Sequence, residues 1–119
     1  MAKQPPRLLK AADHQFKPRF AYGDQAQVSV ISGPDDGTEL GTGMVRMQNA
    51  EIPWTIKYDE VVLVLEGELT IRTAGGDLTA GPRDSIWLPK GTELTYVAES
   101  ALVFYAIHPA NWADAGDQP

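Results

Sequence analysis

The stretch that decides the fold is Tyr58-Asp59-Glu60-Val61-Val62-Leu63-Val64-Leu65-Glu66-Gly67-Glu68-Leu69. Its β-branched and aliphatic centre predicts a strand over residues 58–65, and Glu66-Gly67 ends that strand. The apolar run occupies both faces of the pleat. We therefore expect this strand to be buried on both sides.

The segments on either side of this stretch also have strand patterns. Residues 68–73 alternate, with Leu69 and Ile71 on one face, and Ala74-Gly75-Gly76 is a hairpin signal before a returning strand over 77–80. The other predicted strands are 25–31, 43–48, 85–88, 93–97 and 101–108. The 11 Gly and 9 Pro residues divide the chain into short segments and leave no room for a long helix. About eight short strands predict an all-β jelly roll or small barrel.

The 119 residues are expected to form one domain, 1–119. Within it, residues 1–20 form an extended N-terminal arm with one helical turn around 8–12, residues 21–112 form the barrel, and 113–119 form a tail. A second short helical turn is expected around 111–115.

The composition excludes several classes of partner and site. The net charge of −6 opposes binding to nucleic acid and to anionic membranes. With no cysteine, the chain has no disulfide, thiolate metal site or cysteine nucleophile. The N-terminus has no apolar signal-peptide core, and apolar runs such as Val61 to Leu65 are far shorter than the ~18 residues of a membrane span. We expect a cytoplasmic protein.

Three further strings accompany the opening stretch. Within that stretch, Glu60 and Gly67, with six residues between them, resemble the later half of the first cupin motif, and Asp84-Ser85-Ile86-Trp87-Leu88-Pro89-Lys90-Gly91 resembles the second. The cupin family usually has Gly before that Asp, where this chain has Arg83. The strings Pro53-Trp54-Thr55 and Pro109-Ala110-Asn111-Trp112 resemble the cupin domain of the ethanolamine-utilization protein Q family. Longer members of that family carry an additional N-terminal region.

The resemblance implies a cupin-type double-stranded β-helix and a two-fold homodimer. Metal-binding cupins use three His and one Glu. Here the first two His positions fall on Trp54 and Ile56, or on Pro53 and Thr55, and the third falls on Leu94. The chain has only two histidines, His14 and His108, so it cannot supply three from one subunit. We expect no metal and no cofactor.

Glu60 is the acidic residue that remains from that ligand set. It is either a solvated rim carboxylate or, as the resemblance implies, a carboxylate inside the barrel, where it needs a hydrogen bond or a raised pKa. Tyr58, two residues earlier, shares its face in a regular strand. Glu60 and Tyr58 are therefore the candidate catalytic pair.

Four further residues are candidate ligand contacts: Thr55, Lys57, Tyr96 and Trp87. Lys57 faces solvent in a regular strand and reaches the pocket only if the strand contains a bulge. Tyr96 and Trp87 are alternatively packed core or interface aromatics. His108 is expected to be structural or on the rim, and His14 has no assigned role.

The sequence thus favours a metal-free cupin of the ethanolamine-utilization type. It would bind a small polar or anionic metabolite in the barrel and could serve as an accessory enzyme of ethanolamine or acetyl-phosphate metabolism. The resemblance also implies an association with a bacterial microcompartment. The alternatives are a structural or interaction protein with a filled barrel and a metal-free acid–base enzyme. Phosphate-binding Gly-rich loops and a G-x-S-x-G motif are absent from the sequence.

Overall fold

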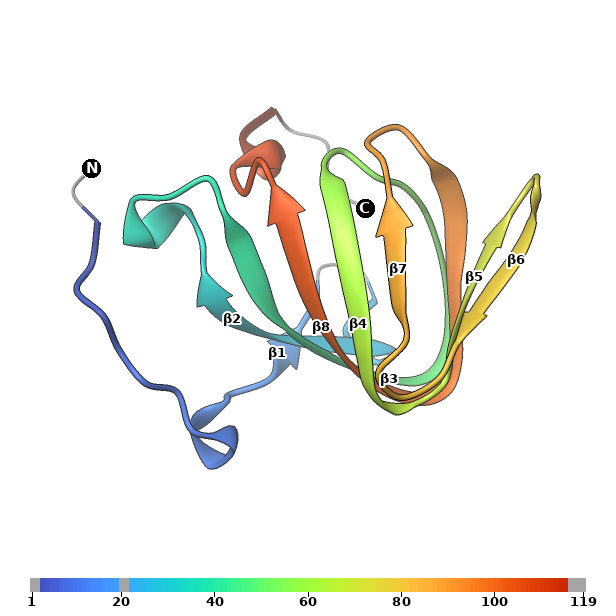
Figure 1. The fold of residues 1–119 in the computed structure, drawn as a ribbon, viewed down its shortest axis with the longest axis horizontal. Coiled ribbons are helices and arrows are strands. Elements are labelled where there is room, and N and C mark those ends of the chain that lie inside the picture. The colour runs from blue at the N-terminus through green and yellow to red at the C-terminus, as the bar shows by residue number, and fades with distance from the viewer. Residues whose placement is uncertain (1–2, 20–21, 116–119) are drawn as a thin grey trace.

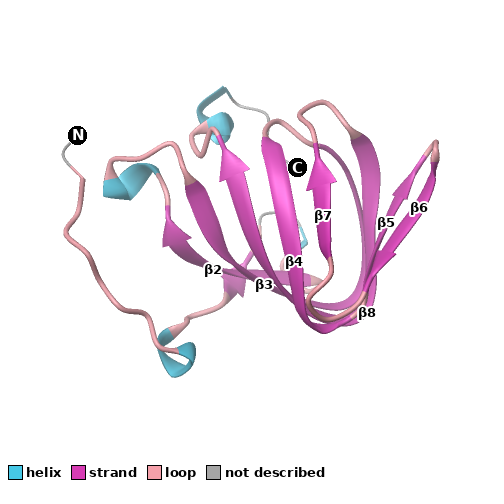
Figure 2. Cartoon of the chain, in the orientation of Figure 1, coloured by secondary structure: helices cyan, strands magenta, loops and turns pink. Residues whose placement is uncertain are grey.

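The computed structural model describes residues 3–19 and 22–115, which form a strongly bent antiparallel sheet (Figures 1 and 2). Its strands are β1 (Lys17–Pro18), β2 (Ala26–Ser32), β3 (Gly41–Thr55), β4 (Asp59–Gly67), β5 (Leu69–Thr73), β6 (Gly76–Ala80), β7 (Ser85–Leu88) and β8 (Glu93–His108). The helical segments described are the 3-10 turns η1 (Ala11–Asp13), η3 (Pro34–Asp36) and η4 (Trp112–Ala115). The prediction of an all-β fold is confirmed.

The two long strands, β3 and β8, hold the barrel together. They pair along their length, from Gly41 opposite Ile107 to Thr55 opposite Glu93. The second half of β8 pairs with β4 on its other side, whereas its first half pairs with β5. The sheet therefore bends along these two strands, and Figure 1 shows both ribbons curving around the closed end of the barrel. The strand order of the sheet is β1-β2-β3-β8-β4-β7, and the β5–β6 hairpin joins it through the pairing of β5 with β8.

Two predicted strands, 93–97 and 101–108, are one continuous strand in the structure. The exposed residues Glu99 and Ser100 interrupt the apolar pattern at the bend, but the backbone keeps its pairing. Likewise, β3 is more than twice as long as the predicted strand 43–48. The hairpin 69–80 and the strand 85–88 lie where the alternation predicts them.

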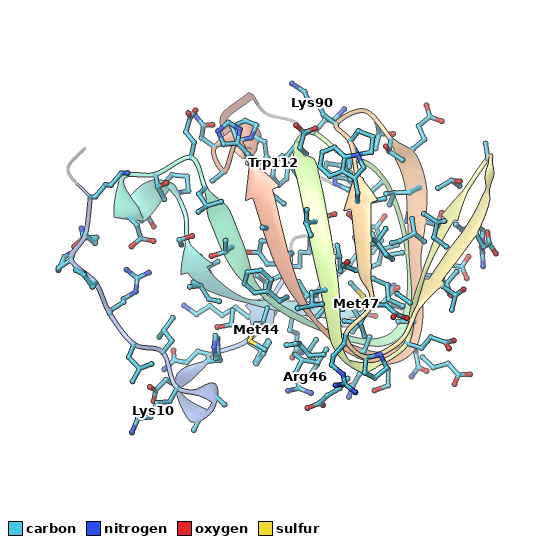
Figure 3. All side chains as sticks on the ribbon, viewed as in Figure 1. Lys10, Met44, Arg46, Met47, Lys90 and Trp112 are labelled. Atoms are coloured by element: carbon cyan, nitrogen blue, oxygen red, sulfur yellow. The ribbon has the colours of Figure 1, made fainter. Side chains whose placement is uncertain are left out.

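The prediction that residues 58–65 are buried on both faces is wrong. Strand β4 alternates, with Val62 and Val64 at 2% and 0% exposure but Val61 and Leu65 at 42% and 38%. The outer face is exposed because the described part of the chain has no helix or second layer to cover it. Strand β3 alternates in the same way, with Met47 buried and Arg46 exposed (Figure 3).

Two turns around β4 have left-handed backbone conformations. Gly67 has φ 77°, and a Cβ there would overlap the carbonyl oxygen of Ser100, so the cupin-motif glycine is required. Arg83, at the position where the family usually has Gly, has φ 73°. The left-handed turn is thus kept with an arginine, and its N–H donates to the Val64 carbonyl at 2.7 Å.

The N-terminal arm lies along the edge of β2. Its helical turn is η1, slightly later than the expected 8–12, and Lys17 and Pro18 pair with Val28 and Gln27. The Arg7 guanidinium forms an ion pair with Asp36 at 2.8 Å. Residues 20–21 of the arm and barrel, and 116–119 of the tail, lie outside the described residues. Among the residues that are described, no helix is long and apolar enough to cross a bilayer.

Candidate functional site

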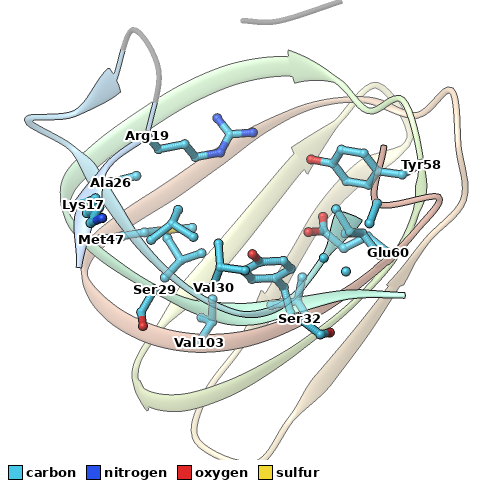
Figure 4. A pocket seen from close by; sticks show the side chains of 18 of the residues that line it. Lys17, Arg19, Ala26, Ser29, Val30, Ser32, Met47, Tyr58, Glu60 and Val103 are labelled. Carbon is cyan, nitrogen blue, oxygen red and sulfur yellow. The ribbon is translucent and has the colours of Figure 1, made fainter. Parts of the chain in front are cut away.

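A cavity of about 640 Å³ lies inside the barrel, in the part that we call the open half, which β2, β3, β4 and β8 surround (Figure 4). Its walls are the inner faces of β2, β3, β4 and β8, and its rim includes the N-terminal arm and Trp112 of η4. Most of the lining side chains are apolar, among them Val45, Met47 and Val103. The polar lining side chains include two carboxyl groups, two cationic side chains and three phenols: Glu60, Asp13, Lys17, Arg19, Tyr58, Tyr96 and Tyr105. The inner end contains Glu60 and the phenols.

Glu60 is the buried carboxyl group. It belongs to the inner face of β4, two residues before the fully buried Val62, and only 7% of its surface is exposed. The Tyr96 hydroxyl, from the first half of β8, donates a hydrogen bond to Glu60 Oε1 at 2.9 Å. Because β8 bends, a residue from its first half, which pairs with β5, meets a residue of β4 inside the barrel.

The environment of Glu60 changes its acidity. Burial raises the pKa of Glu60 from 4.5 to about 7, because the charged form loses its hydration. The hydrogen bond from Tyr96 and the positive charge of Arg19 oppose that effect but do not cancel it. A carboxyl group with a pKa near neutrality can both accept and donate a proton at physiological pH.

Tyr58 lies near Glu60 and belongs to an aromatic cluster at the rim of the cavity. Its hydroxyl accepts a hydrogen bond from Trp54 Nε1 at 3.2 Å. The Trp112 ring lies 5.2 Å from the ring of Tyr58 and 5.6 Å from that of Trp54, between centroids. Burial, followed by the charge of Glu60, raises the pKa of Tyr58, so this phenol is a neutral donor at physiological pH.

Arg19, Tyr105 and Trp112 are site residues that the sequence analysis did not identify. Tyr105 lines the cavity from β8, and burial raises its pKa to about 12. Its inward position follows from the alternation of β8, which could have indicated it. Trp112 belongs to a string already recognised as family-like. Arg19 has no such local signal, because its place depends on the pairing of β1 with β2.

The predicted site residues divide into two groups. Glu60, Tyr58 and Tyr96 come together in the cavity. Thr55 and Lys57, at and after the end of β3, are half-buried and are not part of the cavity lining among the described residues. Trp87 is 59% exposed and lies on the outer face opposite Val61, because β7 alternates and its inward residues are Ile86 and Leu88. It therefore faces away from the cavity.

Neither histidine contacts Glu60. His14 Nδ1 lies 2.7 Å from Ser29 Oγ, beneath the arm, and His108 Nε2 lies 3.9 Å from Glu39 on the surface. Ile56, one of the alternative ligand positions implied by the cupin resemblance, and Leu94, the third position, are buried hydrocarbon side chains. Within 3–19 and 22–115 no three His, Cys, Asp or Glu side chains gather at one point. These donor atoms do not fit a cupin metal centre.

The comparisons with known proteins agree with this fold. Residues 14–114 match the family model described as ethanolamine utilisation protein EutQ. The chain belongs to the EutQ family. A crystallised ethanolamine utilization protein Q from Salmonella typhimurium LT2 superposes with a TM-score of 0.79 at 29% identity, over 86% of this chain and 85% of that one. An RmlC-like cupin from Shewanella frigidimarina, at 14% identity and a TM-score of 0.72 over 91% and 95% of the two chains, shares the fold.

The curated EutQ relatives are longer than this chain. A protein of Escherichia coli K12 called acetate kinase EutQ is 40% identical over 79 residues, which are 66% of this chain and 34% of the relative. The match therefore spans about a third of that protein. A EutQ of Clostridioides difficile with the same description is 34% identical over 66% of this chain and 51% of its own length.

Proposed function

We propose that this EutQ-type cupin binds a small polar or anionic metabolite in its barrel without a metal ion, with Glu60 and Tyr58 at the reacting or recognising end. The observation that carries the proposal is the buried carboxyl group of Glu60 within a cavity of about 640 Å³. Burying a carboxyl group is unfavourable unless something compensates. A site for a ligand is the function that such an arrangement serves most often.

The chemistry available is acid–base chemistry. Glu60, with its pKa near 7, can take or give a proton, while Tyr96 and Tyr58 orient its carboxyl group and a bound polar group. This supports an accessory enzyme of ethanolamine or acetyl-phosphate metabolism, since the relatives are called acetate kinases. Because the chain spans only 34% of the Escherichia coli relative, that whole-protein activity enters here as part of the proposal.

The test uses isothermal titration calorimetry to compare the ligand affinity of wild type with that of Glu60→Gln. A thermal-shift panel of amines, aldehydes, carboxylates and acyl phosphates first identifies a ligand. Glu60→Gln keeps the shape of the side chain and removes its ionisation. We expect binding to weaken at least tenfold, which corresponds to ~1.4 kcal/mol, and Tyr58→Phe to weaken it by about 1 kcal/mol. Affinity that is unchanged in Glu60→Gln contradicts the proposal.

The main alternative is a structural or interaction protein with a filled barrel. Part of the interior is indeed filled, with Ile56 and Ile71 at 0% exposure and outside the cavity lining. The open half, however, contains the cavity, and its size is in the range of small-molecule sites. That favours ligand binding over a purely structural role.

A homodimer is the second part of the proposal. Val61, Leu65 and Trp87 form an exposed apolar strip on the outer face of β4 and β7. We call it the outer strip. Contiguous exposed apolar surface usually marks a contact with another molecule, and a second copy of the chain is the partner proposed. A cytoplasmic location, with association with a microcompartment, completes the proposal.

A further inference from the structure

The N-terminal arm delivers a cation to the barrel. Lys17 and Pro18 pair with β2 as β1, and the Arg19 N–H then donates to the Ala26 carbonyl at 3.1 Å. These backbone bonds direct the Arg19 side chain over the open half of the barrel, where it forms part of the cavity lining. Figure 4 shows its guanidinium pointing across the cavity toward Tyr58 and Glu60.

The guanidinium is held rather than loosely placed. Its Cζ lies 5.9 Å from the centre of the Trp54 ring, a cation–π distance, and its Nη1 is out of contact with solvent. Trp54 in turn donates to Tyr58, so the cation and the phenol share one support. Residues from the arm, β3 and the β3–β4 connection thus meet on one side of the cavity.

The charge of the site follows from these groups. Arginine stays protonated at all physiological pH values. The charge of Arg19 lowers the pKa of Glu60, yet burial keeps that pKa about 7, so near neutral pH a large share of Glu60 is uncharged. The three phenols of the cavity, Tyr58, Tyr96 and Tyr105, have raised pKa values and are neutral. The group formed by Arg19, Glu60 and the three phenols is therefore cationic on average near neutral pH, although the whole chain carries −6.

We propose that Arg19 is the oxyanion-binding residue of this site and that the ligand carries a carboxylate or phosphoryl group. The planar guanidinium matches either group with two parallel hydrogen bonds. Glu60 in its acid form then donates a short O–H···O⁻ hydrogen bond to the same ligand, which the amide of Glu60→Gln replaces only with a weaker N–H donor, and the phenols supply further neutral donors. A ligand with its anion at Arg19 and an apolar remainder against Val45 and Met47 fits the lining. This inference rests on the proposed function and specifies the chemical class of its ligand.

The alternative role for Arg19 is structural: it would cover the aromatic cluster and hold the arm in place. A structural arginine changes stability but does not discriminate between charged and uncharged ligands. The experiment therefore compares isosteric probes that differ in charge: acetate with acetamide, and inorganic phosphate and acetyl phosphate as phosphoryl probes. Titration calorimetry at pH 7 measures the affinity of each probe for the full chain.

The variants are Arg19→Gln and Arg19→Lys. The control is Arg72→Gln, which removes one positive charge, as Arg19→Gln does. Arg72 is exposed on β5 and lies 3.9 Å from Glu51, far from the cavity lining. We expect Arg19→Gln to weaken anion binding at least tenfold and to leave acetamide binding within twofold of wild type. Arg19→Lys should recover part of the affinity for phosphate, since it keeps the charge but not the fork geometry. Arg72→Gln should behave as wild type.

A second variant tests delivery of Arg19 by β1 without changing Arg19 itself. A Cβ on Gly23 would lie 2.5 Å from the Pro18 Cβ, so Gly23→Ala pushes β1 away from its place. The matched control is Gly75→Ala in the β5–β6 turn, where the nearest atom is 3.8 Å away. We expect Gly23→Ala to weaken anion binding at least threefold, with circular dichroism unchanged, and Gly75→Ala to have no effect.

The outcomes separate this inference from the proposed function. If Arg19→Gln retains anion affinity, or loses acetate and acetamide equally, the assignment of Arg19 is overturned. If Gly23→Ala binds anions as wild type does, delivery by β1 is overturned. If wild type binds only amines or uncharged ligands, and Glu60→Gln abolishes that binding, the inference of an oxyanion ligand is overturned. The proposed function then stands. Preference between carboxylate and phosphoryl probes identifies the source of the anion.

Discussion

The two faces of strand β4 reverse the usual distribution of polar and apolar residues. Its inner face carries a carboxyl group, Glu60, next to Val62 and Val64, whereas its outer face carries Val61 and Leu65, each more than a third exposed. In most half-buried strands the charge faces water and the aliphatic side chains face the core. Both departures cost stability in an isolated chain. The inner one supports a ligand site and the outer one a contact with a second chain.

We expect the largest difference in stability between two variants that place a charge on the inner or the outer face of β4. Val64→Asp buries an unpaired carboxylate at a position with 0% exposure, so we expect the free energy of unfolding to fall by about 4 kcal/mol or more. Val61→Asp, on the outer face, should cost less than about 1 kcal/mol in dilute, monomeric protein. Urea unfolding followed by circular dichroism measures both. Similar losses at the two positions would mean that the faces are not as different as their exposure indicates.

The next effect is the pH dependence caused by Glu60. Its pKa is raised from 4.5 to about 7, so between these pH values the unfolded chain releases a proton that the folded chain keeps. Rising pH therefore favours unfolding in this window, and the loss is complete above the folded pKa. Since a tenfold change in a protonation equilibrium is ~1.4 kcal/mol, the full loss is about 3 kcal/mol.

Glu60→Gln removes this titration. The difference in unfolding free energy between the variant and wild type should grow by about 3 kcal/mol in favour of the variant between pH 4 and pH 8. Parallel urea titrations across that range measure it, with Glu66→Gln, an exposed residue of the same strand, as the control. A difference that does not change with pH, or a marked loss of stability in Glu60→Gln at neutral pH, would show that Glu60 is instead a charged structural partner in the core.

A smaller effect concerns the outer strip. If two copies associate through it, Trp87, at 59% exposure in the single chain, is its largest apolar side chain. Trp87→Asp should then weaken the dimer by about 2 kcal/mol or more, the scale of an aromatic hot spot. Sedimentation velocity at micromolar concentration measures the association, with Leu78→Asp on β6 as a control on another exposed aliphatic residue. A wild-type chain that sediments as a 13.0 kDa monomer contradicts the dimer.

The smallest effect concerns the turn that leads into β7, the strand that pairs with β4. Arg83 has φ 73°, which is unfavourable for a residue with a Cβ, while Gly adopts it freely. After allowing for the extra chain entropy of Gly in the unfolded state, we expect Arg83→Gly to stabilise the fold by about 0.5 kcal/mol. Arg72→Gly, within strand β5, should have the opposite sign and cost about 1 kcal/mol. Thermal unfolding of the two variants side by side checks the signs.

Short-range patterns in the sequence predicted a large part of the fold. The alternation around Leu69 and Ile71, the Gly75-Gly76 turn and the strand 85–88 are local features, and they appear in the structure where they were expected. The pattern failed where exposure depends on distant parts of the chain. Alternation cannot tell whether anything covers the outer face of β4, and a polar bend within β8 has the same local pattern as a turn between two strands.

The site shows the same division. The sequence by itself determined that this is a EutQ-type cupin, with Glu60 in a strand and Gly67 at its end, because the pattern of residues along a strand is local. Tyr58, predicted to begin the same strand, lies in the β3–β4 connection directly before it. Only the tertiary structure decided that Tyr96 donates to Glu60, that the pKa of Glu60 lies about 7, and that Arg19 enters the cavity. Each of these depends on burial or on contacts between separate strands, as for Glu60 and Tyr96, which are 36 positions apart, and no local pattern encodes such contacts.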